Sequence, residues 1–128
     1  MQSNNQKQVV AAIIKKNNRY LIAQRNKNKH LALKWEFPGG KVNSGETLKE
    51  ALIREIKEEL NIQIKIEKKI ANEFYKDEVI NIQLHYFLCF HMKGIIELKE
   101  HENIAWVKKN DFFNYEFAEG DGKILSLL

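Results

Sequence analysis

Covalent cross-links and membrane-spanning segments are absent from this sequence. Its one cysteine, Cys89, excludes an internal disulfide, suits a reducing cytoplasm, and is expected to be a small buried hydrophobe and not a nucleophile. No apolar run approaches the roughly 18 residues of a membrane span. The first residues, MQSNNQKQ, are polar and lack the apolar segment of a signal peptide. We therefore expect a cytoplasmic protein without a membrane partner.

The sequence also lacks the length for a second domain and a strong net charge of either sign. The length of 128 residues suits a single domain, 1–128, around one core. The formal net charge is only +4, from 21 Lys and Arg against 17 Asp and Glu, which mildly favours anionic partners such as nucleotides. The lysines form no basic patch interleaved with aromatic residues, so no stable nucleic-acid complex is expected.

Turn-forming residues are scarce, since the chain has 1 proline and 6 glycines. The proline lies in Pro38-Gly39-Gly40, which indicates a sharp turn with close backbone approach. Before this turn, Val9 to Lys15 and Tyr20 to Gln24 predict a hairpin of two largely buried strands. The polar segment from Arg25 to Leu33 predicts a loop.

After the turn, helices and strands interleave without internal repeats, which favours an α/β domain with helices against a mixed sheet. Alternating apolar residues predict strands at Ile62 to Ile66 with a continuation to Tyr75, at Val79 to Met92, at Ile95 to Leu98 and at Ile104 to Val107. We expect helical segments at Thr47 to Leu60, at Lys109 to Phe113 and at Lys123 to Leu128.

The helix from Thr47 to Leu60 carries acidic residues on its apolar side. At about 100° per residue, Glu55 and Glu59 fall within the apolar arc, and Glu58 lies at its edge. Clustered carboxylates repel one another and are costly to bury unless a cation lies beside them, and Mg²⁺ prefers such oxygen ligands. The alternative is a solvated acidic face partnered by Arg54 and Lys57. The overlap with the apolar arc favours the metal site.

The two ends of this helix have their own signals. Thr47 and Glu50 form the pattern of a capping box, so Glu50 is assigned to helix initiation and not to chemistry. Asn61 tolerates the left-handed conformation in which many helices end.

The spacing around this helix resembles the Nudix box, G-x5-E-x7-R-E-U-x-E-E-x-G-U, in which U is a bulky apolar residue. The one departure is Asn61 in place of glycine, and the matching residues are Gly40, Glu46, Arg54, Glu55, Ile56, Glu58, Glu59 and Ile62. The hairpin from Val9 to Arg25, the segment KWEFPGGK and the C-terminal part, with Glu100 before Trp106, are similar to MutT-type members of the family.

This resemblance implies a Nudix fold, an α/β/α sandwich with a central mixed β-sheet, and hydrolysis of a nucleoside triphosphate to the monophosphate and pyrophosphate. It also implies Mg²⁺ as cofactor, with Mn²⁺ as a substitute, held by Glu55, Glu58, Glu59, Glu100 and the carbonyl of Gly39. Either Glu55 or Glu100 would be the general base. Arg54 would orient Glu55 or pair with Glu46, a supporting residue. We expect a monomer or a weak homodimer.

By the same resemblance, the base is selected outside the box, and the substrate-binding candidates are Arg25, Phe37, Gly39, Gly40 and Asp121. Phe37 would stack on a base or belong to the core. Arg25 would donate to a phosphate or a carbonyl, or remain a solvated loop charge. Asp121 would accept from an exocyclic amine or a ring N–H, or cap the last helix.

Three functions are therefore open. The leading one is an 8-oxo-dGTP diphosphatase that cleans the nucleotide pool and so serves DNA replication and repair. The second, suggested by Asp121, is a CTP or 5-methyl-dCTP pyrophosphohydrolase. The third is a non-catalytic nucleotide- or nucleic-acid-binding module, although such a module could lose its carboxylates and this chain has kept them. The histidines, His30, His85, His91 and His101, show no zinc-ligand spacing and are assigned no metal role.

Overall fold

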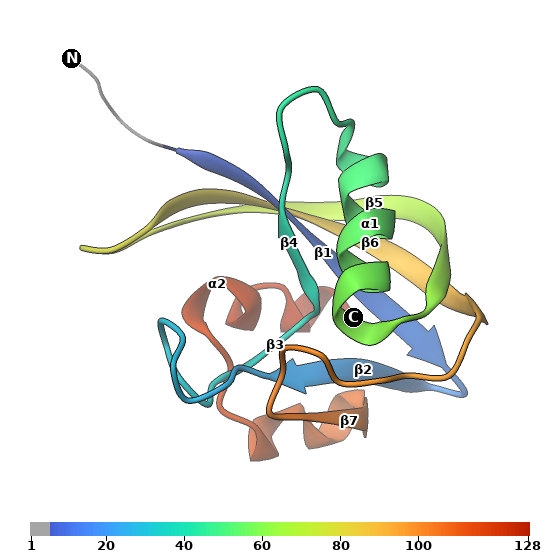
Figure 1. The fold of residues 1–128 in the computed structure, drawn as a ribbon. Helices are drawn as coiled ribbons and strands as arrows, with labels where there is room; N and C mark the ends of the chain where they lie inside the picture. Colours follow the sequence, from blue (N-terminus) through green and yellow to red (C-terminus); the bar gives the residue numbers. More distant parts are fainter. Residues whose placement is uncertain (1–5) are drawn as a thin grey trace.

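The computed structural model describes residues 6–128, and of residues 119 and 120 the backbone alone. Residues 1–5 of the polar N-terminal stretch lie outside the described residues. The elements follow one another along the chain as strands, one long helix and short C-terminal helical segments (Figure 1). Their bounds are β1 Lys7–Lys16, β2 Arg19–Gln24, β3 Trp35–Glu36, β4 Gly39–Lys41, α1 Leu48–Leu60, β5 Gln63–Lys76, β6 Asn81–Lys93, β7 Asn103–Lys108, η1 Lys109–Asn114, α2 Glu119–Gly122 and η2 Leu125–Leu127.

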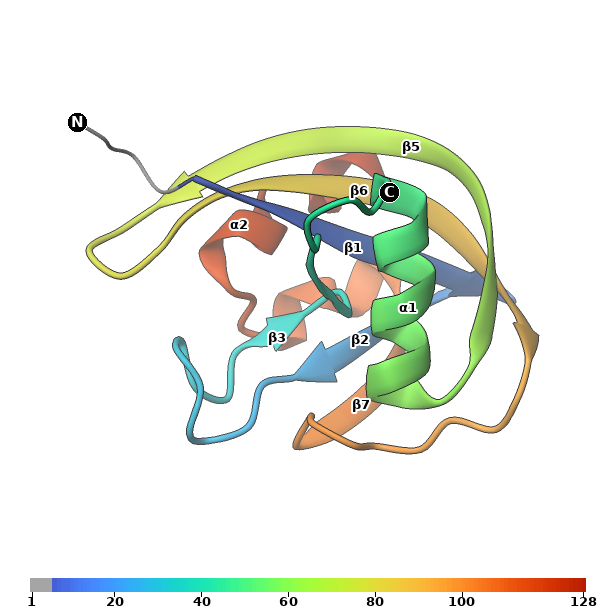
Figure 2. The ribbon, with the colours of Figure 1, turned by 45° about the horizontal axis from the view of Figure 1, so that its top comes forward.

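The strands form a mixed sheet, as the alternation of elements predicts. Its order is β3-β2-β1-β6-β5, with β4 paired to β1 and β7 paired to β2. Strands β1 and β6 are parallel, whereas β5 and β6 form a long, curved antiparallel hairpin (Figure 2). The predicted first hairpin is confirmed, and its tight turn places Asn17 and Asn18 at φ 51° and 63°, the conformation that suits two-residue hairpin turns.

One face of the sheet is covered by α1. The capping box is confirmed, because the Thr47 hydroxyl accepts from the Glu50 N–H while the Glu50 carboxylate accepts from the Thr47 N–H. Asn61 ends the helix in the left-handed conformation, at φ 59°. The apolar stripe of α1 packs on β1, β5 and β6 in a core that includes Val10, Leu52, Ile56, Leu60, Ile64 and Phe87.

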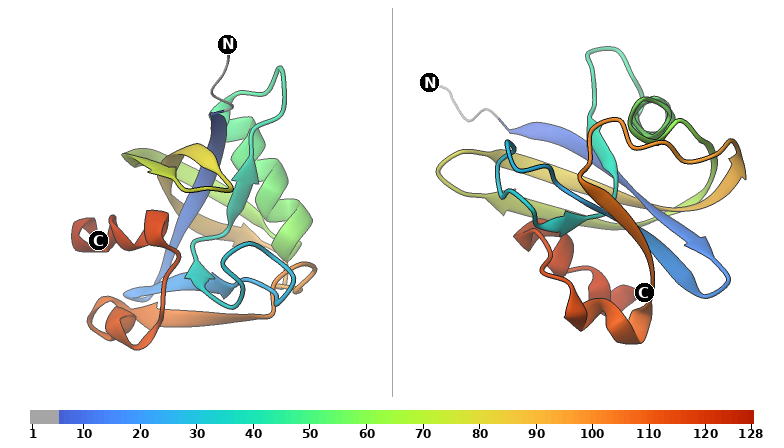
Figure 3. Two further views of the ribbon diagram at one scale, coloured as in Figure 1. Left: turned by 90° about the vertical axis from the view of Figure 1, so that its left-hand side faces the viewer. Right: turned by 60° about the horizontal axis from the view of Figure 1, so that its bottom comes forward.

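The other face is covered by the short C-terminal segments, which lie opposite α1 (Figure 3, left). The predicted helical segment near Lys109 is confirmed as η1, but the predicted helix from Lys123 to Leu128 is wrong. The chain instead forms a single turn, α2, before that stretch and only a short 3-10 helix, η2, within it. The reason is Asp121, whose side chain is drawn into the core and fixes the turn earlier. Ala118 is the N-cap of α2, so the capping alternative for Asp121 is also wrong.

The predicted strand from Ile95 to Leu98 is wrong as well. This segment runs as an irregular connection between β6 and β7. Its backbone donates to the end of α1: Glu97 N lies 2.9 Å from Leu60 O, and Lys99 N lies 3.2 Å from Glu59 O. The last carbonyls of a helix have no partner within it, so this segment satisfies them instead of pairing with a strand. The connection is thereby tied to the end of the acidic helix.

Within residues 6–128, no helix is long and apolar enough to cross a membrane.

Candidate active site

The two glycines of the turn allow two close approaches. A Cβ at Gly39 would lie 1.9 Å from the Val10 carbonyl oxygen, so this glycine lets β4 pack on β1. A Cβ at Gly40 would lie 2.3 Å from the carboxyl carbon of Glu55, so this glycine lets α1 bring its first candidate carboxylate against the turn. The turn Pro38-Gly39-Gly40 thus packs against the carboxylate of Glu55 through Gly40.

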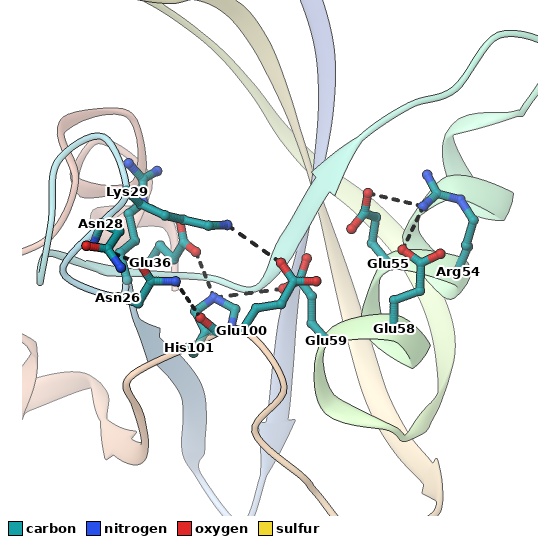
Figure 4. A network of polar contacts seen from close by, with 11 residues as sticks. Asn26, Asn28, Lys29, Glu36, Arg54, Glu55, Glu58, Glu59, Glu100 and His101 are labelled. Atoms are coloured by element: carbon teal, nitrogen blue, oxygen red, sulfur yellow. Dashed lines mark hydrogen bonds and ion pairs between the residues drawn. The ribbon is translucent and has the colours of Figure 1, made fainter.

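Arg54 joins the loop before α1 to the glutamates on it. Its Nε and Nη2 donate to the two carboxylate oxygens of Glu46 at 2.6 and 2.9 Å, and Nη2 also donates to the Lys41 carbonyl at 3.0 Å. Its Nη1 contacts Glu55 at 3.2 Å and Glu58 at 3.1 Å (Figure 4). Both roles considered for Arg54 are therefore geometrically present in one side chain.

Glu59 is the most deeply buried of the three helix glutamates, at 4% exposure. Burial, a hydrogen bond with Glu55 and the negative charges of Glu36, Glu55 and Glu100 raise its pKa to about 10. Its Oε1 has no hydrogen-bond partner. An orphaned, buried carboxylate oxygen surrounded by other carboxylates is costly, and a hard divalent cation would remove that cost.

Among the described residues, no three acidic, histidine or cysteine side chains already stand together as a ready coordination group. Two of the helix glutamates, Glu55 and Glu58, instead share a contact with one nitrogen of Arg54 (Figure 4). The donor set nevertheless fits a divalent cation, because it consists of oxygens, one of which is buried and unpaired.

Glu100 stands on the connection between β6 and β7, across from α1. Its carboxylate lies 3.7 Å from the Lys29 ammonium, and both side chains are about half exposed. Its carbonyl accepts from the Asn26 side chain at 2.9 Å, which ties this connection to the loop after β2. The fold thus brings Glu100 to the glutamates of the helix from a distant part of the sequence.

A cavity of about 600 Å³ lies between these elements. Predicted site residues lining it are Arg25, Phe37, Gly39, Gly40, Glu55, Glu59, Glu100 and Asp121. Glu58, Arg54 and Glu46 do not line it and lie behind or beside Glu55. Tyr75, Ile80, Ile82 and Leu84 give the cavity an apolar wall as well.

Arg25 is held in place and is not a solvated loop charge. Its Nε donates to Glu36 at 2.6 Å and its Nη1 to the His30 carbonyl at 2.9 Å. His30 in turn contacts Asp77 at 2.8 Å, so the loop after β2 reaches the tip of the β5–β6 hairpin. These contacts close the cavity on the side away from α1.

The other two base-pocket candidates are buried. The Phe37 ring is 2% exposed and packs against Phe112 and Phe117, at ring-centroid distances of 6.3 and 5.7 Å. Asp121 accepts from the Phe37 N–H at 3.0 Å and from the Tyr86 hydroxyl at 2.5 Å. Burial and the charge of Glu36 raise the pKa of Asp121 to about 7, although both hydrogen bonds lower it. A base contacting either residue would have to reach into the cavity floor.

Sequence reasoning missed two residues of this site, Glu36 and His101. Glu36 accepts from Arg25 and, at 2.8 Å, from Nε2 of His101. The strand alternation of Trp35, Glu36 and Phe37 places Glu36 on the side opposite its aromatic neighbours, which was a usable signal. His101 had none beyond its place next to Glu100, because its partner is 65 residues away.

Comparison with known proteins agrees with this architecture. The family model described as NUDIX domain matches residues 5–128. The chain is 33% identical over 118 residues to the CTP pyrophosphohydrolase of Escherichia coli, covering 92% of this chain and 87% of that protein. It is 36% identical over 119 residues to the 8-oxo-dGTP diphosphatase of Buchnera aphidicola, covering 91% and 88%.

A solved structure shows the same fold. The MutT protein of Methanosarcina mazei superposes with a TM-score of 0.88 at 23% identity, over 99% of this chain and 95% of that one. Nudix hydrolases act on nucleotide substrates and require a divalent metal ion, in agreement with the carboxylates described above. From its matched length, its similarity to these relatives and its mixed sheet, the chain belongs to the Nudix hydrolase family.

Proposed function

We propose that this protein is an Mg²⁺-dependent nucleoside triphosphate pyrophosphohydrolase that releases the nucleoside monophosphate and pyrophosphate, with 8-oxo-dGTP as its preferred substrate. The observation that carries the proposal is the buried, unpaired Glu59 carboxylate oxygen at a cavity of about 600 Å³, a volume that suits a nucleotide. The relative named 8-oxo-dGTP diphosphatase supports the choice of substrate.

Each residue has a role in this reaction. Glu55, Glu58 and Glu59 of α1, Glu100 and the Gly39 carbonyl would hold the metal ions. Bound there, Mg²⁺ neutralises charge on the phosphate oxygens and acidifies the attacking water. Glu55 or Glu100, both at the cavity wall, takes the proton of that water. Arg54, which is fixed by its hydrogen bonds to Glu46, keeps Glu55 in position through its own contact with that carboxylate.

The base would enter the part of the cavity away from the helix glutamates. Arg25 and Asp121 line this part, together with the Phe37 that belongs to the buried cluster. The oxidised guanine differs from guanine by an N–H at position 7 and a carbonyl at position 8. An acceptor such as Asp121 and a donor such as Arg25 match this pair of groups.

A second candidate is hydrolysis of CTP or 5-methyl-dCTP. Asp121 favours it, because a carboxylate accepts from the exocyclic amine of cytosine, and a relative of similar length is named CTP pyrophosphohydrolase. We further propose that the protein works in the cytoplasm, where the nucleotide pool lies, as a monomer or weak homodimer without a stable nucleic-acid complex. Gel filtration with and without oligonucleotide tests the last two points.

The test of the reaction is a substrate panel. Pure protein with Mg²⁺ or Mn²⁺ is incubated with normal, oxidised and methylated triphosphates, and pyrophosphate and orthophosphate are measured separately. We expect pyrophosphate, the highest kcat/KM for 8-oxo-dGTP, and loss of turnover in Glu58→Gln. The highest kcat/KM for a cytidine nucleotide would support the second candidate. Nucleotide binding without any pyrophosphate release would contradict both and support a non-catalytic binding module.

A further inference from the structure

His101 lies between the carboxylates of Glu36 and Glu59, each on a different element. Its side chain is 3% exposed. Nε2 is 2.8 Å from Oε2 of Glu36 on β3 and 3.8 Å from Oε1 of Glu59 on α1. Figure 4 shows the ring pointing inward from the connection after β6, with Glu36 and Glu59 on either side of it. No role in the reaction has yet been given to this histidine.

The Glu36 end of this contact is anchored. Burial alone would raise the pKa of Glu36, but the hydrogen bonds from His101 and Arg25 hold the pKa below its usual range. Glu36 is therefore an ionised acceptor, and Nε2 of His101 is the donor to it. Glu36 thus accepts from two side chains: Arg25, at the proposed base end of the cavity, and His101, at the proposed metal end.

The Glu59 end concerns the carboxylate oxygen that has no hydrogen bond. Among the described residues, the ion-pair contact of this oxygen, Oε1 of Glu59, is with Nε2 of His101 at 3.8 Å. The distance is too long for a hydrogen bond, so the imidazole packs against Glu59 without occupying the oxygen. Glu59 is thereby restrained while that oxygen stays available.

Backbone hydrogen bonds fix the connection on both sides of Glu100 and His101. Lys99 N donates to the end of α1 at 3.2 Å, and Glu102 N donates to Gln24 O at 2.9 Å. Between these two points lie Glu100 and His101. The Glu100 side chain is 45% exposed and lies 3.7 Å from the half-exposed Lys29, and the Asn26 side chain donates to the Glu100 carbonyl at 2.9 Å. The buried imidazole is therefore the inward anchor of this stretch, and together with the Asn26 contact it sets where Glu100 stands.

We propose that His101 is a positioning residue for the metal site: by donating to Glu36 and packing against Glu59, it fixes Glu59 and the adjacent Glu100 relative to each other. The proposal rests on the proposed function for its kinetic consequences, but not for its effect on metal affinity. Residues that orient metal ligands typically change metal affinity or activity by about 10- to 100-fold when they are replaced.

The test compares His101→Ala with His101→Gln, because a glutamine amide can place an N–H near the position of Nε2. His91→Ala is the matched control, since the His91 imidazole contacts the carbonyl of Gly94, just after β6, and does not line the cavity. Binding of Mn²⁺ to each protein without nucleotide is measured by electron paramagnetic resonance, and kcat and KM are measured separately. We expect His101→Ala to lower kcat and Mn²⁺ affinity at least about 10-fold, with KM little changed, and His101→Gln to recover most of both.

A double-mutant cycle locates the contact. Glu36→Gln and His101→Ala should each impair Mn²⁺ affinity, and the double variant should be no worse than the more impaired single one, because they break the same contact. Unchanged kcat and Mn²⁺ affinity in a folded His101→Ala would overturn the proposal. So would equal loss in His101→Gln and His101→Ala, or additive losses in the cycle. If no triphosphate is hydrolysed, the proposed function fails, and the Mn²⁺ titrations still decide the role of His101.

Discussion

The carboxylate of Glu55 occupies the space in which a side chain at Gly40 would begin, with 2.3 to 2.5 Å between its atoms and an ideal Cβ. We therefore expect Gly40→Ala to displace Glu55 and to lower kcat by roughly 100-fold, the effect of misplacing a catalytic group by about 1 Å. Gly122→Ala is the control, because nothing lies within 4 Å of a Cβ there. Kinetics together with melting curves of both variants check this, and normal turnover in Gly40→Ala would contradict it.

The buried Glu59 should lower the unfolding free energy of the metal-free protein relative to the Glu59→Gln variant. Its pKa is raised to about 10, so above pH 5 the folded state keeps a proton that the unfolded chain has lost, and the unfolding free energy falls as pH rises toward 10. Glu59→Gln should melt higher than wild type at pH 8 in EDTA.

The same variant should lose the response to metal. Mg²⁺ should raise the melting temperature of wild type by binding the native state only, and should have much less effect on Glu59→Gln. Differential scanning fluorimetry over a Mg²⁺ titration measures both. A wild-type protein that ignores Mg²⁺ would count against the site, and a Gln variant that responds fully would exclude Glu59 as a ligand.

Asp121 gives a second pH dependence in a narrower window. Its pKa is 3.8 in the unfolded chain and about 7 in the native state. Between these values the native state binds more protons, so the unfolding free energy falls as pH rises from about 4 to 7, by up to about 4 kcal/mol. Asp121→Asn cannot titrate, and its stability curve should be flatter there. Urea unfolding at pH 4.5 and 7.5 checks this.

The control for Asp121 is Asp111→Asn, since Asp111 is exposed on η1. Its stability curve should run parallel to that of wild type. If Asp121→Asn also gives a parallel curve, burial of Asp121 as a protonated group is wrong.

Replacing Lys29 should change the affinity for metal and the affinity for substrate in opposite directions. It lies 3.7 Å from Glu100 at the cavity wall, where a phosphate would compete for it. Lys29→Ala should free Glu100 and tighten Mn²⁺ binding without nucleotide, while raising KM for the triphosphate. Because the pair is half exposed, each change should be at most about fivefold. Lys27→Ala, on the same loop but not at the cavity, should show neither change, and changes of the same sign would contradict this role.

The local parts of the molecule could be predicted from the sequence. The helix bounds, its capping box, the left-handed Asn61 and the apolar arc each depend on residues within a few positions of one another. The same holds for the hairpin at Asn17 and Asn18, whose turn and strands are contiguous. Periodicity therefore located Glu55, Glu58 and Glu59 on the helix before any contact was known.

Contacts across the fold could not be predicted in this way. Asp121 meets the Phe37 N–H over 84 residues of sequence, and the turn that carries it, α2, precedes the expected last helix. The run from Ile95 to Leu98 has the composition of a strand, yet its hydrogen-bond partners are the last carbonyls of α1. An apolar pattern shows that a segment packs, but not which backbone groups it will satisfy.

The backbone hydrogen bonds between the β6–β7 connection and the end of α1 also determine where in this connection an insertion is tolerated. Residues from Gly94 to Ile96 precede the first backbone contact with the helix, and Ile95 is 85% exposed. An insertion beside the exposed Ile95 should lengthen a surface loop. Between Lys99 and Glu102, both anchored, a single extra residue would move Glu100 and His101 out of register with the helix. The span of the proposed metal site is thus set by a few residues of this connection and by the end of α1.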